Sequence, residues 1–261
     1  MASSKPVVIV TGAARGIGKG CALELARTGF NVLINDLPDP VSVEKLKTVQ
    51  HECESLGAEV VCFSANVADL DLHEVMLDTA ENKWGRLDCL LNNAGISVKS
   101  RGDLLDMKPD SFDENFAVNT RAPFFLSQAF SHRLLKTPGN KDVHRSIIFI
   151  SSINAVMLAM NRGEYTMAKT AVSVAARLFA IRLVKEGIGV YEVRPGLIKT
   201  DMTIPATAYY DELISKGLVP QGRWGYPEDI ASTVRAMAEG KLIYTCGQAI
   251  EVDGGLSVSR F

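Results

Sequence analysis

Residues 7–18 read VVIVTGAARGIG, and a segment with helical periodicity follows them to about Thr28. The β-branched run at its start predicts a buried strand, and the glycines after it predict a tight turn into the helix. Glycine lets the backbone approach a pyrophosphate, which the N–H groups and dipole of a helix N-terminus bind. The spacing is GxxxGxG rather than the GxGxxG of the best-known dinucleotide fingerprint. These residues predict the phosphate-binding turn of a βαβ unit.

A second signal for a nucleotide is Asp36, which follows the glycines at the distance of about 20 residues seen in such units. Asn31–Asn35 predicts the second strand, and Asp36 closes it. An acidic side chain there can accept hydrogen bonds from an adenosine ribose. The alternative is that Asp36 merely starts the turn DLPDP, which turn chemistry favours equally.

The rest of the chain alternates between strand and helix patterns. Such alternation predicts right-handed crossovers and a parallel sheet with helices on both faces, which is an α/β fold. Because no linker or internal repeat is found, residues 1–261 are expected to form one domain. Further strands are expected at 59–63, 87–91, 147–150, 188–193 and 248–252, and further helices at 42–55, 69–83, 109–135, 165–185 and 228–239.

Local features add to this pattern. Asp69 is the expected N-cap of its helix, and Pro123 lies inside a helical pattern and predicts a kink. The turn NNAG, residues 92–95, lies at the carboxyl end of a strand, where open α/β sheets bind ligands. The segment at about 197–225 is longer than an ordinary connection and rich in Thr, Tyr and Pro, which predicts a substrate loop or lid.

Composition excludes several classes of function. The chain is 47% hydrophobic and 22% charged with a net charge of −2, so it lacks the basic footprint of a nucleic-acid-binding protein. No apolar run approaches the ~18 residues that span a bilayer, and the first residues, MASSKP, do not form a signal peptide. The cysteines and histidines show no metal-ligand spacing. We expect a cytoplasmic protein without a metal, nucleic-acid or membrane partner.

Three groups with complementary chemistry lie in residues 151–169, SSINAVMLAMNRGEYTMAK. Tyr165 and Lys169 are four residues apart and share one face of a helix, so the ammonium favours the phenolate. Half-ionising a tyrosine at pH 7 needs a pKa shift of about 3 units, or roughly 4 kcal/mol. Together with the Ser152 hydroxyl, this pair predicts an acid/base for an alcohol oxygen. The alternative is chance, since YxxxK alone is a weak pattern.

Together these motifs resemble those of the short-chain dehydrogenase/reductase family over nearly the whole chain. The family's order and spacing are matched by TGAARGIG, NNAG, Asn119, Ser152, Tyr165 with Lys169, Pro195-Gly196 and Asp253-Gly254-Gly255. The resemblance implies a Rossmann-type, doubly wound sheet of seven strands in the order 3-2-1-4-5-6-7. It also implies an NAD(P)(H)-dependent oxidoreductase that interconverts a secondary alcohol and a ketone by hydride transfer.

The resemblance implies a catalytic set. Tyr165 would be the acid/base, and Lys169 would hold the nicotinamide ribose and lower the pKa of Tyr165. Ser152, preferred to Ser151 for its distance before Tyr165, would bind the substrate oxygen. Asn119 would hold a water that connects Lys169 to solvent.

The resemblance also implies which residues meet the cofactor. Asp36 favours NAD(H), because its carboxylate repels a 2′-phosphate, whereas Arg15 could hold that phosphate and leaves NADP(H) as the alternative. Asn66 stands where many members have Asp, and its amide can still pair with the adenine edge. The expected set is Gly12, Arg15, Gly16, Ile17, Gly18, Asp36, Asn66, Val67, Asn93, Ala94, Gly95, Tyr165, Lys169, Pro195, Gly196, Ile198 and Thr200.

A small polar hydroxy or keto compound, such as a sugar or polyol, is the preferred substrate. The alternative is a 3-oxoacyl-acyl-carrier-protein reductase, the branch that the chain resembles most. A regulator that binds a dinucleotide without catalysis is a remote alternative. Glu186 argues against the carrier protein, because an arginine often ends the corresponding helix. A basic patch for that partner would consist of Arg133, Lys136, Lys141 and Arg145.

The pocket itself is expected to include Asn154, Arg162, Tyr209 and Tyr210. Arg162 and Glu164 would either bind a polar substrate or pair with each other. The resemblance further implies a homotetramer. The aromatic ring of Phe261 invites burial, either against a neighbouring subunit or against its own.

Overall fold

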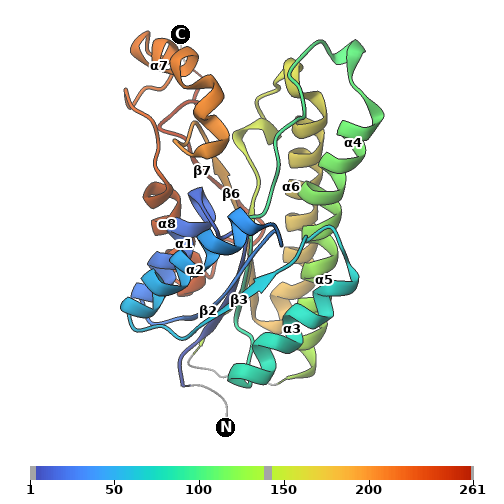
Figure 1. Cartoon of the computed structure of the whole chain (residues 1–261), viewed down its shortest axis with the longest axis vertical. Coiled ribbons are helices and arrows are strands. Elements are labelled where there is room, and N and C mark those ends of the chain that lie inside the picture. Colours follow the sequence, from blue (N-terminus) through green and yellow to red (C-terminus); the bar gives the residue numbers. More distant parts are fainter. Residues whose placement is uncertain (1–3, 138–142, 260–261) are drawn as a thin grey trace.

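The computed structural model of the chain describes residues 4–137 and 143–259. Its seven strands form one parallel sheet in the order β3-β2-β1-β4-β5-β6-β7 (Figure 1), which confirms the expected Rossmann-type topology. The strands are β1 Val7–Thr11, β2 Asn31–Asp36, β3 Val60–Ser64, β4 Cys89–Asn92, β5 Arg145–Ile150, β6 Ile188–Pro195 and β7 Ala249–Val252.

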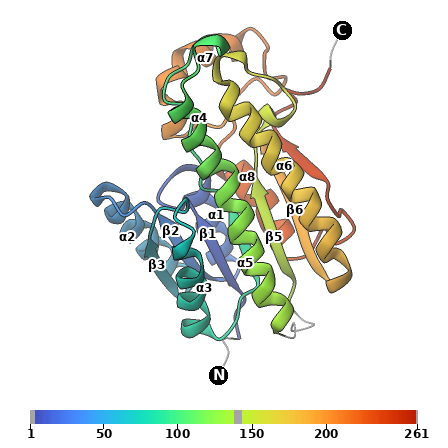
Figure 2. The same cartoon turned by 90° about the vertical axis from the view of Figure 1, so that its right-hand side faces the viewer.

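Helices cover both faces of the sheet, as the two perpendicular views show (Figures 1 and 2). One layer contains α1 Gly16–Arg27, α2 Pro40–Ser55 and α8 Pro227–Ala238; the other contains α3 Asp71–Trp84, α5 Ala122–Lys136 and α6 Gly163–Leu183. Side chains of a strand alternate between the faces. Val8 and Val10 of β1 therefore belong to the first core and Val7 and Ile9 to the second.

The helix expected over residues 109–135 is interrupted. α4 Pro109–Phe116 and α5 are joined by a π-helical turn, Ala117–Arg121, in which the N–H of Ala122 binds the carbonyl of Ala117. Proline has no N–H, so Pro123 cannot give the Asn119 carbonyl the bond of a regular α-turn. The expected kink thus takes the form of a wider turn just before the proline.

One other local expectation needs correction. Leu70, not Asp69, is the N-cap of α3, although the Asp69 carboxylate still accepts a hydrogen bond from the Asp71 N–H at 3.2 Å. The segment at about 197–225 is largely helical, with a 3-10 helix at Asp201–Ala206 followed by α7 Thr207–Ser215. Further 3-10 turns are Leu104–Asp106, Ile153–Ala155, Met160–Arg162 and Val184–Glu186.

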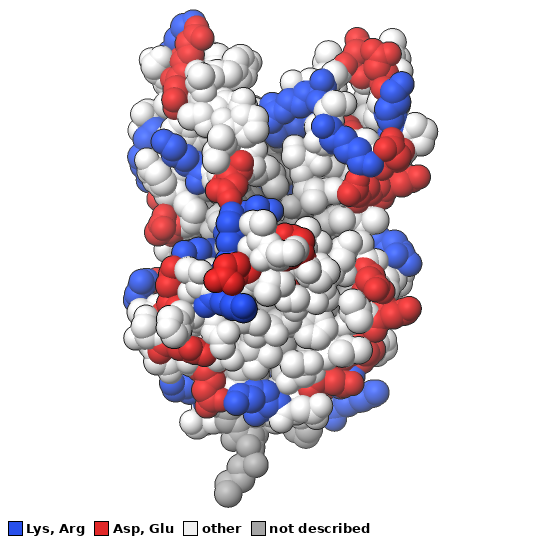
Figure 3. Space-filling view, viewed as in Figure 1, with Lys and Arg blue, Asp and Glu red and all other residues white. Residues whose placement is uncertain are grey.

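The sheet order reverses beside β1, whose neighbours are β2 and β4. Open α/β sheets bind ligands at such a switch point, outside the carboxyl ends of the strands. The molecule is hollowed at that end, between the lobe that carries α7 and the lobe formed by α4 and α6 (Figures 1 and 3). None of the helices in the described part of the chain is long and apolar enough to cross a bilayer.

Candidate active site

A cleft of about 370 Å³ occupies the hollow at the carboxyl ends of the strands. Its volume lies within the range of small-molecule and cofactor sites. Every member of the cofactor set expected from the sequence lines this cleft, and so do Ser152, Asn154, Arg162 and Tyr210. The residues come from segments far apart in the chain, which the parallel sheet brings to one edge.

The glycine-rich turn leaves its backbone open to a ligand. Gly12 has a φ of 66°, and a Cβ there would lie 2.8 Å from Ala94 Cα. A Cβ on Gly18 would lie 2.1 Å from the Gly12 oxygen, so a side chain at either position would need the backbone to move. The Asn93 amide donates to the carbonyls of Thr11 and Gly12 at 2.8 and 3.0 Å. This cradle fits the pyrophosphate of a dinucleotide.

Asp36 both shapes this turn and faces the cleft. Its Oδ2 accepts the Ala14 N–H at 2.9 Å, and its Oδ1 accepts the Leu37 N–H at 2.9 Å. Each carboxylate oxygen has a further lone pair, so the side chain can still accept hydrogen bonds from a ribose. Arg15, on the same side of the cleft, has its Nη1 4.0 Å from the Asp201 carboxylate.

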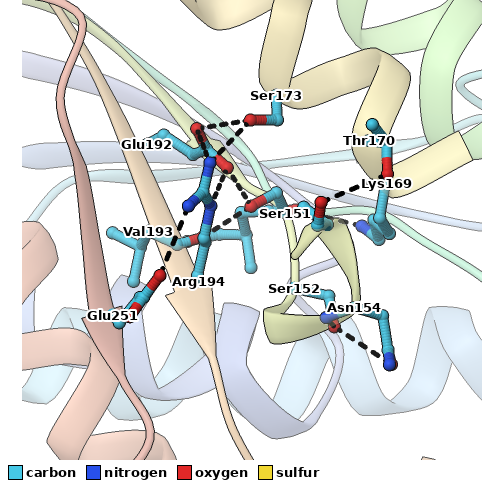
Figure 4. Close-up of polar contacts among 12 residues, drawn as sticks. Ser151, Ser152, Asn154, Lys169, Thr170, Ser173, Glu192, Val193, Arg194 and Glu251 are labelled. Carbon is cyan, nitrogen blue, oxygen red and sulfur yellow. Dashed lines mark hydrogen bonds and ion pairs between the residues drawn. The ribbon is translucent and has the colours of Figure 1, made fainter. Parts of the chain in front are cut away.

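The two adjacent serines have different environments. Ser152 is buried and accepts the Asn154 N–H at 3.1 Å, while the Asn154 amide donates to the Met157 carbonyl at 2.8 Å. The Ser152 hydroxyl also acts on Tyr165, where it lowers the pKa of the phenol against the larger effect of burial. Ser151 instead donates to Glu192 at 2.6 Å, on β6 (Figure 4). Only Ser152 therefore presents its hydroxyl together with the phenol.

Lys169 is buried on α6, one helical turn after Tyr165. Its Nζ donates to the Ile150 carbonyl at 3.0 Å and lies 5.7 Å from the centroid of the Tyr165 ring. Burial lowers the pKa of Lys169 to about 8, and the nearby carboxylate of Glu192 acts in the opposite direction. Lys169 therefore carries its charge at neutral pH but is close to losing it.

The expectation that Lys169 lowers the pKa of Tyr165 is not met here. Burial raises the pKa of the phenol, and the groups that lower it are the Ser152 hydroxyl and the guanidinium of Arg162. Desolvation disfavours the charged form of an acid, and the Lys169 ammonium is directed at the Ile150 carbonyl instead. Without a ligand in the cleft, the phenol is held in its neutral form.

A charged network behind Lys169 was not predicted (Figure 4). Glu192 is 2% exposed and accepts hydrogen bonds from Ser151, from Ser173 at 2.8 Å and from Arg194 at 2.8 Å. Arg194 also reaches Glu251 on β7 at 3.3 Å. The signal was present in the sequence, since two opposite charges, two residues apart, interrupt the otherwise apolar strand β6.

Asn119 lies behind the cleft rather than in it. Its amide donates to the Ile96 carbonyl at 3.0 Å and to Asn115 at 2.6 Å, and its oxygen accepts the Ile96 N–H at 3.0 Å. A Cβ on Gly95 would lie 2.8 Å from Asn119 Oδ1 and 3.4 Å from Lys169 Nζ, so these three residues lie against one another. The side chain of Asn119 ties the loop after β4 to the π-helical turn.

The expected substrate residues are only partly brought together. Tyr209 is 61% exposed and does not line the cleft, whereas Tyr210 does and packs edge-on against Trp224. Arg162 and Glu164 do not pair, because Glu164 is buried and accepts a hydrogen bond from Ser111 at 2.7 Å. Arg101 also lines the cleft but was missed, since nothing in its local pattern marks it.

A dinucleotide cradle in the cleft, together with a buried serine and lysine and a half-buried tyrosine, defines the class of an NAD(P)-dependent oxidoreductase. A family model described as enoyl-(acyl carrier protein) reductase matches residues 12–257. The chain belongs to the short-chain dehydrogenase/reductase family and is an enzyme that acts on CH–OH groups with NAD(P).

Its relatives carry two kinds of name. A 3-oxoacyl-[acyl-carrier-protein] reductase of Synechocystis is 35% identical over 251 residues, 96% of each protein. The crystal structure of a 3-oxoacyl-[acyl-carrier protein] reductase from Brucella melitensis in complex with NAD is 39% identical, with a TM-score of 0.94 and full coverage of both chains. A structure from Agrobacterium tumefaciens named as a 2-deoxy-D-gluconate 3-dehydrogenase, with bound NADP, is 29% identical over 98% of each chain, with a TM-score of 0.84.

Proposed function

We propose that the enzyme interconverts a secondary alcohol and a ketone in a small polar hydroxy or oxo compound, with NAD(H) as the preferred cofactor. The nicotinamide, when bound, exchanges a hydride with the carbinol carbon. Oxidation removes that hydride and one proton from the alcohol, and reduction returns both. The observation that carries this proposal is the arrangement of Ser152, Tyr165 and Lys169 at the closed end of the cleft.

The side chains of the chain take the following parts. Ser152, oriented by Asn154, donates a hydrogen bond to the substrate oxygen, and Tyr165 gives or takes its proton. Lys169 holds a positive charge beside the phenol and presents donors to a ribose. Both N–H groups of the Asn119 amide are engaged, and its Oδ1 accepts one hydrogen bond. The second lone pair of Oδ1 is the acceptor through which Asn119 would hold a water near Lys169.

The cofactor preference rests on Asp36. A 2′-phosphate at roughly 4 Å from its carboxylate would cost up to about 4 kcal/mol per unit charge at an effective dielectric of 20. Arg15, which could offset this, already faces Asp201. The NAD bound to the Brucella relative supports the preference for NAD(H). The NADP bound to the Agrobacterium relative supports the alternative, NADP(H).

A second candidate is the reduction of a 3-oxoacyl thioester on an acyl carrier protein. The names of the relatives at 35% and 39% identity favour it over a sugar or polyol. The surface that we expected to bind the carrier gives it little support. Arg133 is held by Glu74, Asp78 and Glu81, and it lies in the last turn of α5, at the opposite end of the molecule from α7 (Figure 2). Lys141 lies outside the described residues.

One comparison separates the candidates. The purified enzyme is assayed with NADH and NADPH on an acetoacetyl group carried by the acyl carrier protein, on the same group as a small thioester, and on small free oxo compounds. A preference of tenfold or more for the carrier-bound form establishes the second candidate. Equal or better use of the free compounds supports the first. Absence of turnover with every ketone and secondary alcohol tested refutes both.

A further inference from the structure

The substrate end of the cleft carries positive charge without a matching carboxylate. Arg162 and Arg101 both line it, and in the described part of the chain neither forms an ion pair with an acidic residue. Their segments adjoin, because the Gly102 N–H donates to the Asn161 carbonyl at 3.3 Å. Basic side chains are visible on the wall of the hollow between the two lobes (Figure 3).

The acidic residues that line the same region are already occupied. Glu114 lies 3.1 Å from Lys99, and Asp201 lies 3.1 Å from Lys45. Neither can neutralise the two arginines without giving up its own partner. The substrate end of the cleft therefore has a local excess of positive charge, and low-dielectric walls strengthen its attraction for an anion.

Arg162 is placed where the reaction would occur. It directly precedes α6, and its guanidinium carbon lies 5.5 Å from the centroid of the Tyr165 ring. Its Nε is buried and has no hydrogen-bond partner among the described residues. The terminal N–H groups of the same guanidinium also have no partner within the described ranges, and Arg162 lines the cleft, so these groups can bind a ligand there.

We propose that Arg162, supported by Arg101, binds a carboxylate of the substrate, so that the enzyme acts on short hydroxy acids and the corresponding oxo acids. A planar guanidinium matches a carboxylate with two parallel hydrogen bonds. The inference rests on the proposed function, because it takes Tyr165 as the group that meets the carbinol oxygen. With that oxygen at Tyr165, a carboxylate a few bonds away reaches Arg162.

The test uses pairs of substrates that differ only in the carboxylate, such as acetoacetate and its methyl ester, or an aldonic acid and the matching polyol. For the wild type we expect kcat/KM to be at least tenfold higher for the acid. In Arg162→Gln that preference should fall close to one, mainly through KM for the acid. Arg162→Lys should keep part of it, since an ammonium retains the charge but not the planar fork. Any effect of Arg162 on Tyr165 is shared by both members of a pair and cancels in the ratio.

Arg182→Gln is the matched control, because Arg182 is an exposed arginine at the other end of α6, paired with Glu186. It should leave the acid preference unchanged. NADH binding and the melting temperature verify that each variant is folded. If Arg162→Gln does not fold, the Lys variant and the loss of acid preference at high salt take its place.

The outcomes distinguish the two levels of the proposal. If no ketone or secondary alcohol is turned over, the proposed function fails. If esters or thioesters are used as well as the acids, the function stands and the carboxylate site is refuted. Survival of the acid preference in the Arg162→Gln, Arg101→Gln double variant also refutes it.

Discussion

Lys169 depends on a carboxylate behind it. Burial lowers its pKa and the Glu192 carboxylate raises it, and together these effects leave the pKa of Lys169 at about 8. The other charged or titratable groups here are Tyr165 on its own helix and Arg194, which partly neutralises Glu192. We predict that Glu192→Gln lowers the pKa of Lys169 further, so that activity is lost at a lower pH on the alkaline side. The check is the pH profile of kcat/KM.

Glu251→Gln is the control for that variant, because it removes the other, more exposed partner of Arg194 and leaves Glu192 in place. Its alkaline limb should match that of the wild type. Removing one partner of a buried ion pair destabilises a protein by about 3–5 kcal/mol, so Glu192→Gln should also melt earlier. If Glu192→Gln melts earlier but its pH profile of kcat/KM is unshifted, Glu192 has only a structural role.

Tyr165 carries the proton transfer in the proposed reaction. We predict that Tyr165→Phe folds and binds NADH but loses at least the ~100-fold that general acid/base catalysis contributes. Phenylalanine keeps the ring that lies between Arg162 and Lys169 and removes only the hydroxyl. The measurement is kcat at saturating cofactor, with the dissociation constant of NADH as control. Near-wild-type turnover by the pure variant would contradict the assignment.

Asp36 sets the cofactor preference by charge. We predict that Asp36→Ala narrows the ratio of kcat/KM with NADH to that with NADPH, mainly through a better KM for NADPH. Because the Asp36 carboxylate also accepts the Ala14 N–H, Asp36→Asn is the companion variant, since its amide oxygen can keep that bond without the charge. Both variants should lower the ratio of kcat/KM with NADH to that with NADPH. If the wild type uses NADPH as well as NADH, the preference itself is wrong.

At this scale, the sequence predicted residues whose relation is local. Tyr165 and Lys169 are one helical turn apart, and the glycines are contiguous with their strand and helix. It could not predict Arg101, whose role arises only when distant segments meet. The charges of Glu192 and Arg194 were visible in the sequence, but their partners Ser151 and Ser173 lie on other segments and could not be predicted from it. The predicted direction of the Tyr165 pKa shift was wrong for a similar reason. Burial raises the pKa of the phenol by more than the neighbouring charge lowers it.

At the scale of elements, the interruption between α4 and α5 positions Asn119. Pro123 removes the donor that would continue a regular helix, and the π-helical turn carries Asn119 against Ile96 and Gly95. We predict that Pro123→Ala restores an ordinary turn and displaces Asn119. A misplacement of about 1 Å near a reacting group can lower the rate up to ~100-fold. The measurement is kcat, compared with the melting temperature of the same variant.

Pro109→Ala is the control, because Pro109 occupies the first turn of α4, where its missing N–H breaks no helical bond. It should change neither rate nor stability by much. Unaltered kcat in Pro123→Ala would mean that Asn119 does not need the wider turn.

The segment after β6 shows why the structure of a long connection is harder to predict from sequence than a strand. Thr, Tyr and Pro are poor helix formers, yet residues 207–215 form α7 because tertiary contacts outweigh this propensity. Trp224 donates to Asp211 at 2.6 Å and packs against Tyr210. Asp201, in the 3-10 helix before α7, reaches Lys45 of α2 across the mouth of the cleft. The segment is thus held both by contacts within itself and by an ion pair with α2.

For the whole molecule, the alternation of patterns was enough to predict a parallel sheet with helices on both faces, because crossover rules leave few arrangements. The order of the strands was predicted from the family resemblance, and the structure confirms it. Assembly is a different question, since it depends on surfaces that no periodicity describes. Phe261, from which the sequence suggested a contact between subunits, lies outside the described residues. The prediction of assembly therefore rests on apolar residues exposed on the described surface.

Two separate apolar faces support a homotetramer. On α5 and α6, which lie side by side in Figure 2, Phe125, Val174 and Leu178 are 39%, 42% and 59% exposed around a shallow groove. Beside the edge strand β7, Ile243 and Tyr244 are 72% and 101% exposed. Contiguous apolar surface of this kind marks interfaces, and two distinct two-fold contacts are what a tetramer with three perpendicular two-fold axes uses.

We predict that the enzyme is a tetramer in solution and that Leu178→Glu converts it to dimers held by the β7 face. Across a two-fold axis, Leu178 of one subunit would contact Leu178 of the other or a residue close to it. Because both subunits carry the substitution, Leu178→Glu places two carboxylates in the same contact. Burying a leucine contributes about 1.5–3 kcal/mol, which corresponds to a loss of about 3–12 °C in melting temperature for a chain of this size.

Tyr244→Glu should break the other contact, and the double variant should be monomeric. Val75→Glu, at an exposed apolar residue of α3 that does not line the α5–α6 groove, should leave the tetramer intact. Light scattering on the eluting protein measures each mass directly. A monomeric wild type, or a Leu178→Glu variant that remains a tetramer, would rule out this assembly.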